Sequence, residues 1–447
     1  MKKHPSLHGT GRPESGAALL LSMLVLIVIG MIVYQINNVT LRDLAVSNTD
    51  VTLTQMDLAI ESTLLEVAEN LMDDAAAAGA EDGASGDAAS AMEGGEGEGG
   101  GGGGAVDSKM DSWATAQSTN IGDLTLRILI QDEDSKYNIL NMLVEDEDEA
   151  EAALERVARV IDNFREGTEE DVDTATAEEM ARVMRDHMRE RSDSYLPRGR
   201  LLTDNDEDEA IGMPLTLREF VVLEPFEERH FRDYFDLSDV RVHGLSSFLT
   251  IYTSPGFATG EDEEAIAATG FGVNVNTAPL AVLNALFDER EVDTRFWDAV
   301  LEYRNEAEEV DPTEEVDPML DEFQNEILQR KFFDDLEELS EVYEWDVFEP
   351  EAKAEVEEIL QVESNVFSVY ITARVSTRLE ANQILEFRSR DEKELYERSG
   401  THIVRTVRAV LWRAPGEDGP TIVPLVRWEV LDYAPLEVLD YADDERW

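Results

Sequence analysis

The chain has 447 residues, enough for two or three domains with a sizeable core. Its 99 acidic and 37 basic residues give a formal net charge of −62, which disfavours binding to nucleic acid or to anionic lipid headgroups. The absence of cysteine excludes disulfides, thiolate nucleophiles and cysteine metal sites. The six histidines are scattered, and none lies at metal-ligand spacing or beside a nucleophile motif. We therefore predict a non-enzymatic protein, with no catalytic and no cofactor-binding residues.

An apolar run from Ala17 to Val33 follows a short, net-positive stretch that begins with Lys2 and Lys3. At about 1.5 Å per residue the run would span about 26 Å, the short end of what crosses a bilayer core. A secretory signal peptide would end its apolar region with a small-residue cleavage site, but here the small residue, Gly16, precedes the run. We therefore expect a retained single-pass anchor, with a cytoplasmic N-terminus and the bulk of the chain outside.

Apolar residues continue at roughly helical spacing as far as Met72, without proline or glycine beyond Val33. This predicts one pilin-type helix over residues 17–72, lipid-facing in its first half and amphipathic in its second. Residues 73–120 are rich in alanine, glycine and glutamate, which predicts a flexible linker.

After the linker the pattern changes from strand to helix and back to strand. Residues from Leu124 to Ile130 alternate apolar and polar, and Asp132–Lys136 then predicts a turn. An α+β fold follows, in which a small sheet domain (121–143 and 363–447) is interrupted by an acidic α-helical insertion (144–362). Helices are predicted over 151–165, 177–191, 280–287, 295–303, 319–331 and 351–361, and a pair of helices over 215–234. Late strands are predicted over 367–375, 403–412 and 421–430.

The C-terminal tail contains a short tandem repeat. The hexapeptide Glu429–Ala434 occurs again, unchanged, as Glu437–Ala442. Two copies are too few for a repeat architecture, so we interpret them as a local duplication.

Three polar segments are candidate binding sites. Asn274–Pro279 predicts the start of a helix with a side-chain N-cap. Similar segments open helix-hairpin-helix modules that bind DNA, but such a module also needs a glycine-rich hairpin and nearby basic residues, which this segment lacks. The acidic groups Asp132–Asp134 and Asp204–Asp208 offer oxygen ligands for calcium, but neither matches an EF-hand loop. Solvated surface charge is the favoured interpretation of both groups, and calcium binding stays open.

Several segments, in order, resemble the minor pseudopilin K family of type II secretion systems (general secretion pathway protein K). Ser15–Leu21 resembles a type IV prepilin leader boundary, and Pro214–Phe220 resembles a second family region. Asp132, Glu133, Lys136 and Asn138 match the family's D-E-x-G-K-(I/L)-N-L-N, with Ser135 and Leu140 as departures. Val273–Leu286 is similar to I-N-V-N-T-A-P-x-x-V-L-x-A-L, and contains Asn274, Asn276, Thr277, Ala278 and Pro279. A weaker match comprises the strand 367–375 and the segment 404–413.

The resemblance implies a pilin-like fold, a long N-terminal helix and a small antiparallel sheet, with the helical domain inserted between strands. It implies a leader, residues 1–16, cut by a prepilin peptidase between Gly16 and Ala17, and methylation of the new N-terminus. Position five of the mature chain is then Leu21, where major pilins carry glutamate. The family's acidic motif is represented only by Ile161–Asn163, so no metal ligands are assigned.

The implied role is the tip of a periplasmic pseudopilus that drives protein export across the outer membrane. The implied partners are the minor pseudopilins I and J, then H and the major pseudopilin G, with the inner-membrane assembly platform and the peptidase. The implied location is the bacterial inner membrane, with the bulk of the chain in the periplasm. The alternatives are an unprocessed, signal-anchored periplasmic protein-binding module and a minor pilin of a related type IV filament.

Overall fold

The computed structural model describes residues 14–82, 106–144, 146–165, 167–168, 170–190, 214, 216–235, 241–252, 272–306, 331–376, 402–414 and 420–431. The chain forms two compact units, residues 1–58 and 59–447. Five predictions fall wholly or mostly outside the described residues: the leader, the glycine-rich core of the linker, the acidic run 204–208, the helix 319–331 and the second copy of the tail repeat.

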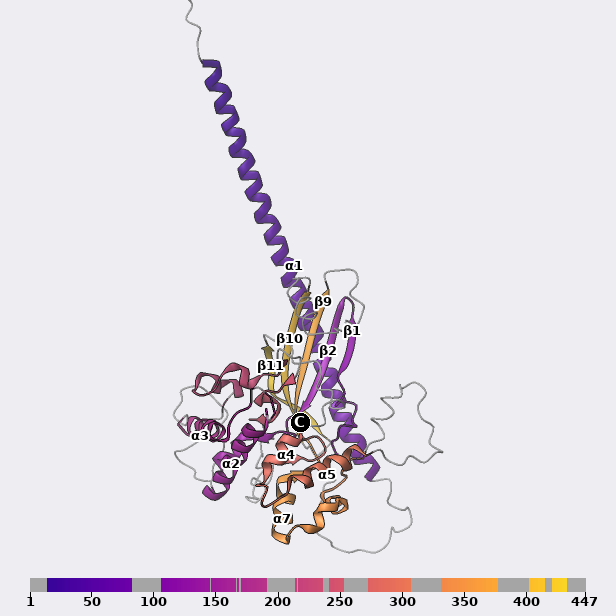
Figure 1. The fold of residues 1–447 in the computed structure, drawn as a ribbon. Helices are drawn as coiled ribbons and strands as arrows, with labels where there is room; N and C mark the ends of the chain where they lie inside the picture. The colour runs from indigo at the N-terminus through magenta and orange to yellow at the C-terminus, as the bar shows by residue number, and fades with distance from the viewer. Residues whose placement is uncertain are drawn as a thin grey trace, which may run out of the picture. The chain divides into compact units, whose positions relative to one another are not determined.

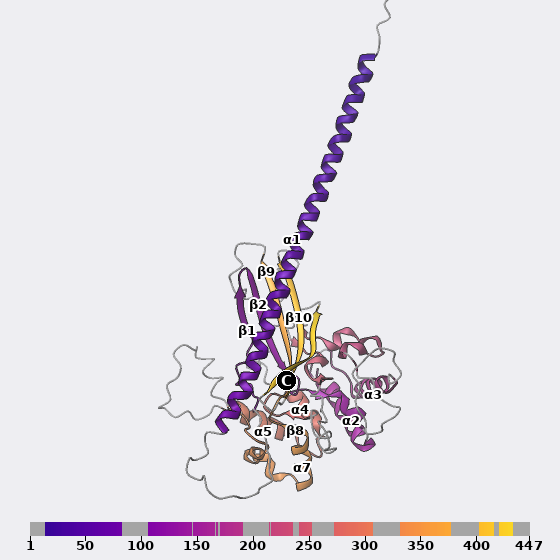
Figure 2. The same ribbon diagram turned by 180° about the vertical axis from the view of Figure 1, so that it is seen from behind.

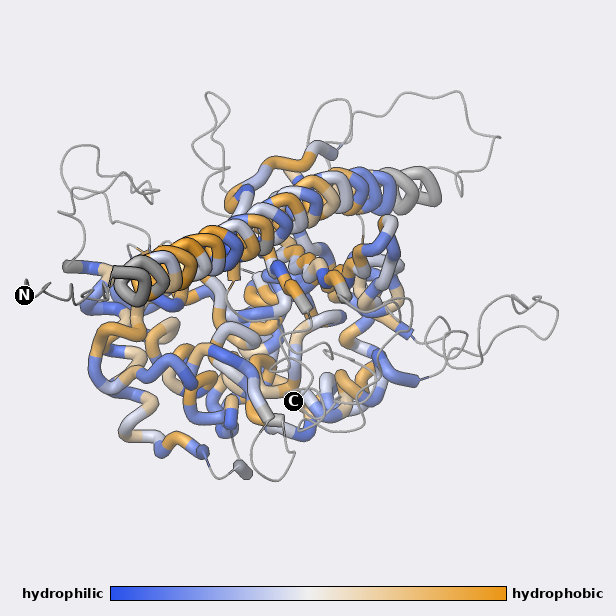
Figure 3. Tube along the Cα trace, turned by 90° about the horizontal axis from the view of Figure 1, so that it is seen from above, coloured by the Kyte–Doolittle hydropathy of each residue, from blue (hydrophilic) through white to orange (hydrophobic). Residues whose placement is uncertain are grey.

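A single helix, α1 (Glu14–Asp82), begins the described chain. In the first unit the large apolar side chains between Leu20 and Val51 are exposed, and from Leu20 onward the helix is long and apolar enough to cross a membrane. Figure 3 shows this apolar stretch as the orange part of the helix near the N-terminus. The hydroxyls of Thr40, Thr52 and Thr54 donate to carbonyls four residues earlier, so these polar groups are satisfied within the helix.

The part of α1 in the second unit lies along one face of a sheet (Figures 1 and 2). Its buried stripe is formed by Ile60, Thr63, Val67 and Leu71, at the three- and four-residue spacing of one helix face. This confirms the amphipathic second half. The helix runs ten residues beyond the predicted end at Met72, because the alanines that follow are strong helix formers. Residues 73–82 are therefore helix and not linker.

The sheet has five antiparallel strands in the order β1-β2-β9-β10-β11. The predicted strands are confirmed, and β1 is an addition inside the predicted linker. A two-residue loop joins β1 to β2, and Gly122 there has φ +63°, which glycine adopts without strain. The strands are β1 (Gln117–Ile121), β2 (Leu124–Asp132), β9 (Val366–Ser376), β10 (His402–Ala414) and β11 (Thr421–Leu431).

Strands β2 and β9 pair directly, with Leu124 opposite Val375 and Asp132 opposite Phe367, although the whole helical region separates them in sequence. This confirms an α+β, pilin-like fold with a helical insertion between strands, and the insertion lies at one end of the sheet (Figure 1). Its helices are α2 (Glu147–Asn163), α3 (Thr174–Glu190), α4 (Leu280–Leu286), α5 (Thr294–Asn305) and α7 (Pro350–Ile359). Its 3₁₀ turns are η1 (Ile139–Leu143), η3 (Leu217–Val222), η4 (Glu228–Phe231), η5 (Leu245–Ser247), η7 (Leu336–Glu341) and η8 (Tyr343–Val347). Its short strands are β3 (Tyr137–Asn138), β4 (Tyr234–Phe235), β5 (Arg241–Val242), β6 (Leu249–Thr250), β7 (Val273–Asn274) and β8 (Leu360–Gln361).

Two helix predictions in the insertion were wrong in detail. The segment 215–234 forms the 3₁₀ turns η3 and η4 and enters β4, because Pro225 between them has no N–H to continue a helix. The helix α7 ends at Ile359, where Leu360 and Gln361 leave it to pair with β7.

Helix α2 packs on α4 through two arginines that extend to the end of α4. Arg156 Nε donates to the carbonyl of Leu286 at 2.9 Å, and Arg159 Nε donates to the carbonyl of Ala285 at 2.8 Å. The last carbonyls of a helix have no partner within it, so the arginines satisfy them and bring positive charge to the helix C-terminus. These contacts fix the C-terminal end of α4 against α2.

Candidate functional site

The two sequence motifs, 132–138 and 273–279, meet at the junction between the sheet and the insertion. Thr277 Oγ1 donates a hydrogen bond to Asp132 Oδ2 at 2.5 Å, and the amide of Asn274 donates to the carbonyl of Asp134 at 2.8 Å. All four residues are buried. We call the buried polar network around these motifs the junction network.

Asp132 lies at the end of β2, at the centre of the junction network. Its Oδ1 accepts from the amide of Asp134 at 2.8 Å, and its Oδ2 also accepts from Ser364 Oγ at 2.6 Å. Burial raises the pKa of Asp132, and the hydrogen bonds from Ser364 and Thr277 oppose part of that rise. One carboxylate thereby joins β2, the segment before α4 and the segment before β9.

Asp134 ties the turn after β2 to the start of β9. Its Oδ2 accepts from the amides of Asn365 at 2.6 Å and Val366 at 3.3 Å. Burial, and then the neighbouring charge of Asp132, hold the pKa of Asp134 well above its usual value. The strand that resumes the sheet after the insertion is therefore positioned by the turn that ended the sheet before it.

Glu133 and Lys136 form a buried ion pair across the same turn, with 2.8 Å between Nζ and Oε1 and side chains 2% and 4% exposed. Glu133 also accepts from Ser368 Oγ on β9 and from Thr250 Oγ1 on β6, both at 2.5 Å. Burial alone would raise the pKa of Glu133, but the Lys136 charge and these hydrogen bonds outweigh it and lower the pKa. A buried ion pair is stable only when its remaining polar atoms are satisfied in this way.

The asparagines of the two motifs bind backbone groups of the insertion. Asn138 Nδ2 donates to the carbonyl of Tyr252 at 2.9 Å, while its Oδ1 accepts from the amide of Leu140 and caps η1. Asn276 binds both backbone groups of Phe333, donating at 2.9 Å and accepting at 2.8 Å.

Asn274 closes the second motif on itself and on the segments that flank the insertion. Its Oδ1 accepts from the amide of Asn276 at 2.8 Å, and its Nδ2 donates to Ser364 Oγ at 2.7 Å and to the carbonyl of Asp107 at 3.0 Å. The predicted side-chain cap was wrong: Pro279 is the N-cap of α4, without a side-chain hydrogen bond. The polar side chains before it are used by the junction network instead, and Ala278 is fully buried beside them.

The interpretation of Asp132–Asp134 as solvated surface charge was also wrong. Their side chains are buried, and their oxygens accept hydrogen bonds from N–H and O–H groups of this chain, as described above. A calcium site needs about six to eight oxygen ligands that are free to bind the ion, and here the carboxylate oxygens are occupied by hydrogen bonds from protein donors. The other acidic run, 204–208, lies outside the described residues.

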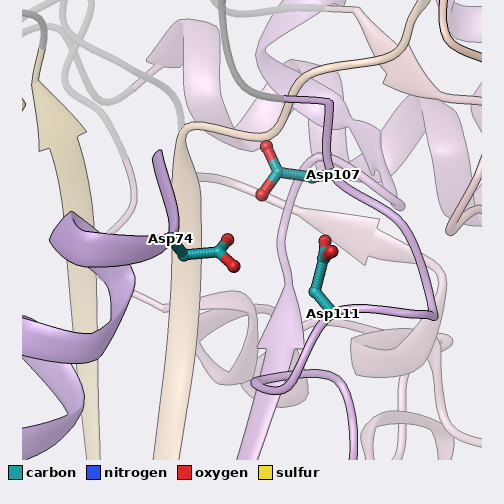
Figure 4. Close-up of side chains that lie close together, drawn as sticks. All are labelled: Asp74, Asp107 and Asp111. Carbon is teal, nitrogen blue, oxygen red and sulfur yellow. The ribbon is translucent and has the colours of Figure 1, made fainter. Parts of the chain in front are cut away.

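A second acidic group lies where the end of α1 meets the segment that precedes β1. The carboxylates of Asp74, Asp107 and Asp111 point toward one another (Figure 4), and their oxygens lie within 4.8 Å. Arg413 of β10 is bound to Asp107 Oδ2, and its Nη1 lies 3.8 Å from Asp74 Oδ2. Since a guanidinium already supplies positive charge and N–H donors there, the group does not fit a calcium site.

Burial shapes the protonation of this acidic group. It raises the pKa of Asp74 and holds that of Asp107 well above its usual value, although Arg413 opposes both shifts. It raises the pKa of Asp111 to about 7. Sequence reasoning missed Asp107, Ser364 and Arg413, because no local pattern indicates that such distant residues meet.

The proposed processing residues, Gly16 and Ala17, lie in the first turns of α1, and the Leu21 side chain is 68% exposed. They take no part in the junction network. Cleavage between Gly16 and Ala17 stays a prediction.

No family model matches the sequence. No curated protein matches it either. Among solved structures the chain is similar to one in the crystal structure of the GspK–GspI–GspJ complex of the enterotoxigenic Escherichia coli type 2 secretion system. The sequence identity is 13% and the TM-score 0.41, over 73% of this chain and 88% of that chain.

Proposed function

We propose that this chain is a minor pseudopilin of a type II secretion system, of the K type, that initiates and caps the periplasmic pseudopilus. The observation that carries the proposal is the junction network. The two segments that resemble the family lie far apart in sequence, yet Asp132 and Thr277 of these segments bond directly where the sheet meets the insertion. If the chain has the architecture of that family, the two motifs are expected to meet in one structural site, as they do in the junction network.

The anchor and the helix surface support an assembly role. In the first unit Val39, Leu44 and Val51 are more than half exposed, as expected of a helix that sister helices cover. Further along the helix, Ile60 and Leu71 are buried within this chain and are not available to sister helices. The proposed contact surface for the minor pseudopilins I and J is therefore centred on residues 39–51.

The proposed tip position follows from two features. An apolar Leu21 at position five needs no charged partner on a neighbouring subunit, whereas a glutamate buried there would. The helical insertion covers one end of the sheet (Figure 1). We propose that it prevents further subunits from stacking on that end. In this proposal H, the major pseudopilin G, the assembly platform and the prepilin peptidase are partners in assembly and maturation.

The first test is the intact mass of the protein extracted from membranes after co-expression with a prepilin peptidase. We expect a chain that begins at Ala17 and carries one N-methyl group. A chain that retains residues 1–16 would contradict the pseudopilin proposal and favour the unprocessed, signal-anchored binding module.

The second test addresses assembly. The substitutions Val39→Asp and Leu44→Asp should abolish co-purification with the minor pseudopilins I and J, because each places an unpaired charge in an apolar helix interface. Thr49→Asp adds the same charge on the side of the helix opposite to Leu44 and Val51 and should leave the complex intact. Complex formation that is unchanged in the first two variants would overturn the proposed interface.

A further inference from the structure

The acidic group of Asp74, Asp107 and Asp111 connects three elements of the second unit (Figure 4). Asp74 lies on α1 and Arg413 on β10, whereas the other two carboxylates lie in the segment before β1. Arg413 binds Asp107, and its Nη1 faces Asp74 Oδ2 at 3.8 Å. Leu71, one turn before Asp74, is fully buried. The group therefore ties the last part of α1 to the sheet, and the proposed function gives it no role.

The negative charges of this group outnumber the positive charge that Arg413 supplies. The three carboxylates have oxygens within 4.8 Å of one another. Asp132, which is buried, adds a fourth negative charge close to Asp107. Other charged residues of the adjoining segments are partly or largely exposed: Asp73, Lys109 and Glu363. Carboxylates this close together in a buried site cannot all be ionised, so the group must hold at least one proton.

One oxygen of the group needs such a proton. Asp107 Oδ2 accepts hydrogen bonds from Arg413 and, at 2.8 Å, from the amide of Ser364. Asp107 Oδ1 is buried and accepts no hydrogen bond from the part of the chain that the structure describes. A buried polar atom without a partner is costly. Since the carboxyls point toward one another (Figure 4), a protonated member of the group has an O–H to donate within it.

Burial favours the protonated form in all three carboxyls. It is the largest cause of the raised pKa in each, and it raises the pKa of Asp111 to about 7, although Arg413 opposes these shifts. The pKa of Asp111 in the folded chain therefore lies above the value of about 4 for an exposed aspartate. The stability that its proton contributes is present below that value and is lost as the pH rises through about 7.

We propose that Asp74, Asp107 and Asp111 share a proton and form a clasp, which releases the last part of α1 from the sheet when the proton leaves. Two members of the site are fixed by further bonds: the Asp107 amide donates to the carbonyl of Val362 at 3.0 Å, and Arg413 Nη2 donates to the carbonyl of Ser364 at 2.6 Å. The Asp74 side chain is 26% exposed and can turn toward water. Repulsion between the ionised carboxylates therefore acts on the contact of α1. The inference is independent of the proposed function.

Hydrogen exchange of the full chain in detergent, followed by mass spectrometry, tests the clasp. Peptides that cover residues 66–75 report the end of α1, and peptides that cover 366–376 report β9 in the middle of the sheet. After correction for the chemical exchange rate, protection of the α1 peptide should fall at least about tenfold between pH 5 and pH 7. It should also be lower than the protection of β9 at pH 7, because the clasp opens without unfolding the sheet. Unchanged protection of the α1 peptide would overturn the proposal, as would protection equal to that of β9.

Substitutions separate the clasp from a general effect of charge. Asp111→Asn removes the titrating group and should reduce the change between pH 5 and pH 7 to less than about threefold. Asp73→Asn removes the same charge from an exposed neighbour on α1 and should leave the change intact. If both variants suppress it equally, the proposal fails. Should Asp111→Asn prevent folding, Asp74→Asn makes the same comparison from the α1 side of the clasp.

Discussion

Removal of the Lys136 ammonium is the sharpest test of the junction network. Lys136→Met retains most of the volume of the side chain but leaves Glu133 buried, with only the hydroxyls of Ser368 and Thr250 as donors. Breaking a buried ion pair by removing one partner costs about 3–5 kcal/mol. We expect a loss of this size in the free energy of unfolding at pH 7.

The loss should depend on pH, with a sign that follows from Glu133. In the wild type its pKa is lowered, so its contribution to stability is present above its ordinary value near 4.5 and is lost as the pH falls. Without Lys136, burial dominates and raises the pKa, so the variant loses stability as the pH rises above that value. The difference between the two proteins should therefore be small near pH 4 and full at pH 7.

The assay is urea unfolding of the full chain in detergent, followed by the fluorescence of its six tryptophans. Lys136→Met combined with Glu133→Gln is the matched control and should recover much of the loss, because it removes the unpaired charge as well. If the difference in the free energy of unfolding between wild type and Lys136→Met is no larger at pH 7 than at pH 4, the reasoning is refuted. It is also refuted if the double variant is no more stable than Lys136→Met.

Three further predictions use the same unfolding assay. Thr277→Val should lower the free energy of unfolding by about 1–3 kcal/mol, because Asp132 loses a buried hydrogen-bond donor. Thr277→Ser should lower it less, because serine keeps the hydroxyl. Asn276→Ala should lower the free energy of unfolding by about 2–6 kcal/mol, because the backbone N–H and C=O of Phe333 both lose their hydrogen-bond partner. A decrease below about 1 kcal/mol would show that water replaces the side chain. Asp111, with its pKa raised to about 7, should contribute a loss of wild-type stability as the pH rises from about 4 to 7, by at most about 1.4 kcal/mol per pH unit, and Asp111→Asn should reduce the slope by that contribution. A slope unchanged in the Asn variant would assign the titration to another group.

Sequence periodicity predicted much of the secondary structure because it is a local property. The strands β2, β9, β10 and β11 and the helices α2 to α5 all have apolar residues spaced for one buried face, and each was found close to its predicted bounds. The interruption of the sheet could also be predicted, from the order of strand and helix signals alone. The motif residues were recognisable from sequence as well, but only as two separate segments.

The tertiary structure alone decided what those motif residues do. Asp132, Glu133 and Asp134 are indistinguishable in sequence from the many surface acids of this chain, yet they are buried. Apart from Lys136 and the Asp134 amide, their donors come from residues 250, 277 and 364–368, which lie more than a hundred residues away and reach the turn only when the insertion closes β2 onto β9. A buried charge is tolerable only where enough donors converge, and such convergence is a property of the folded chain that no local pattern encodes.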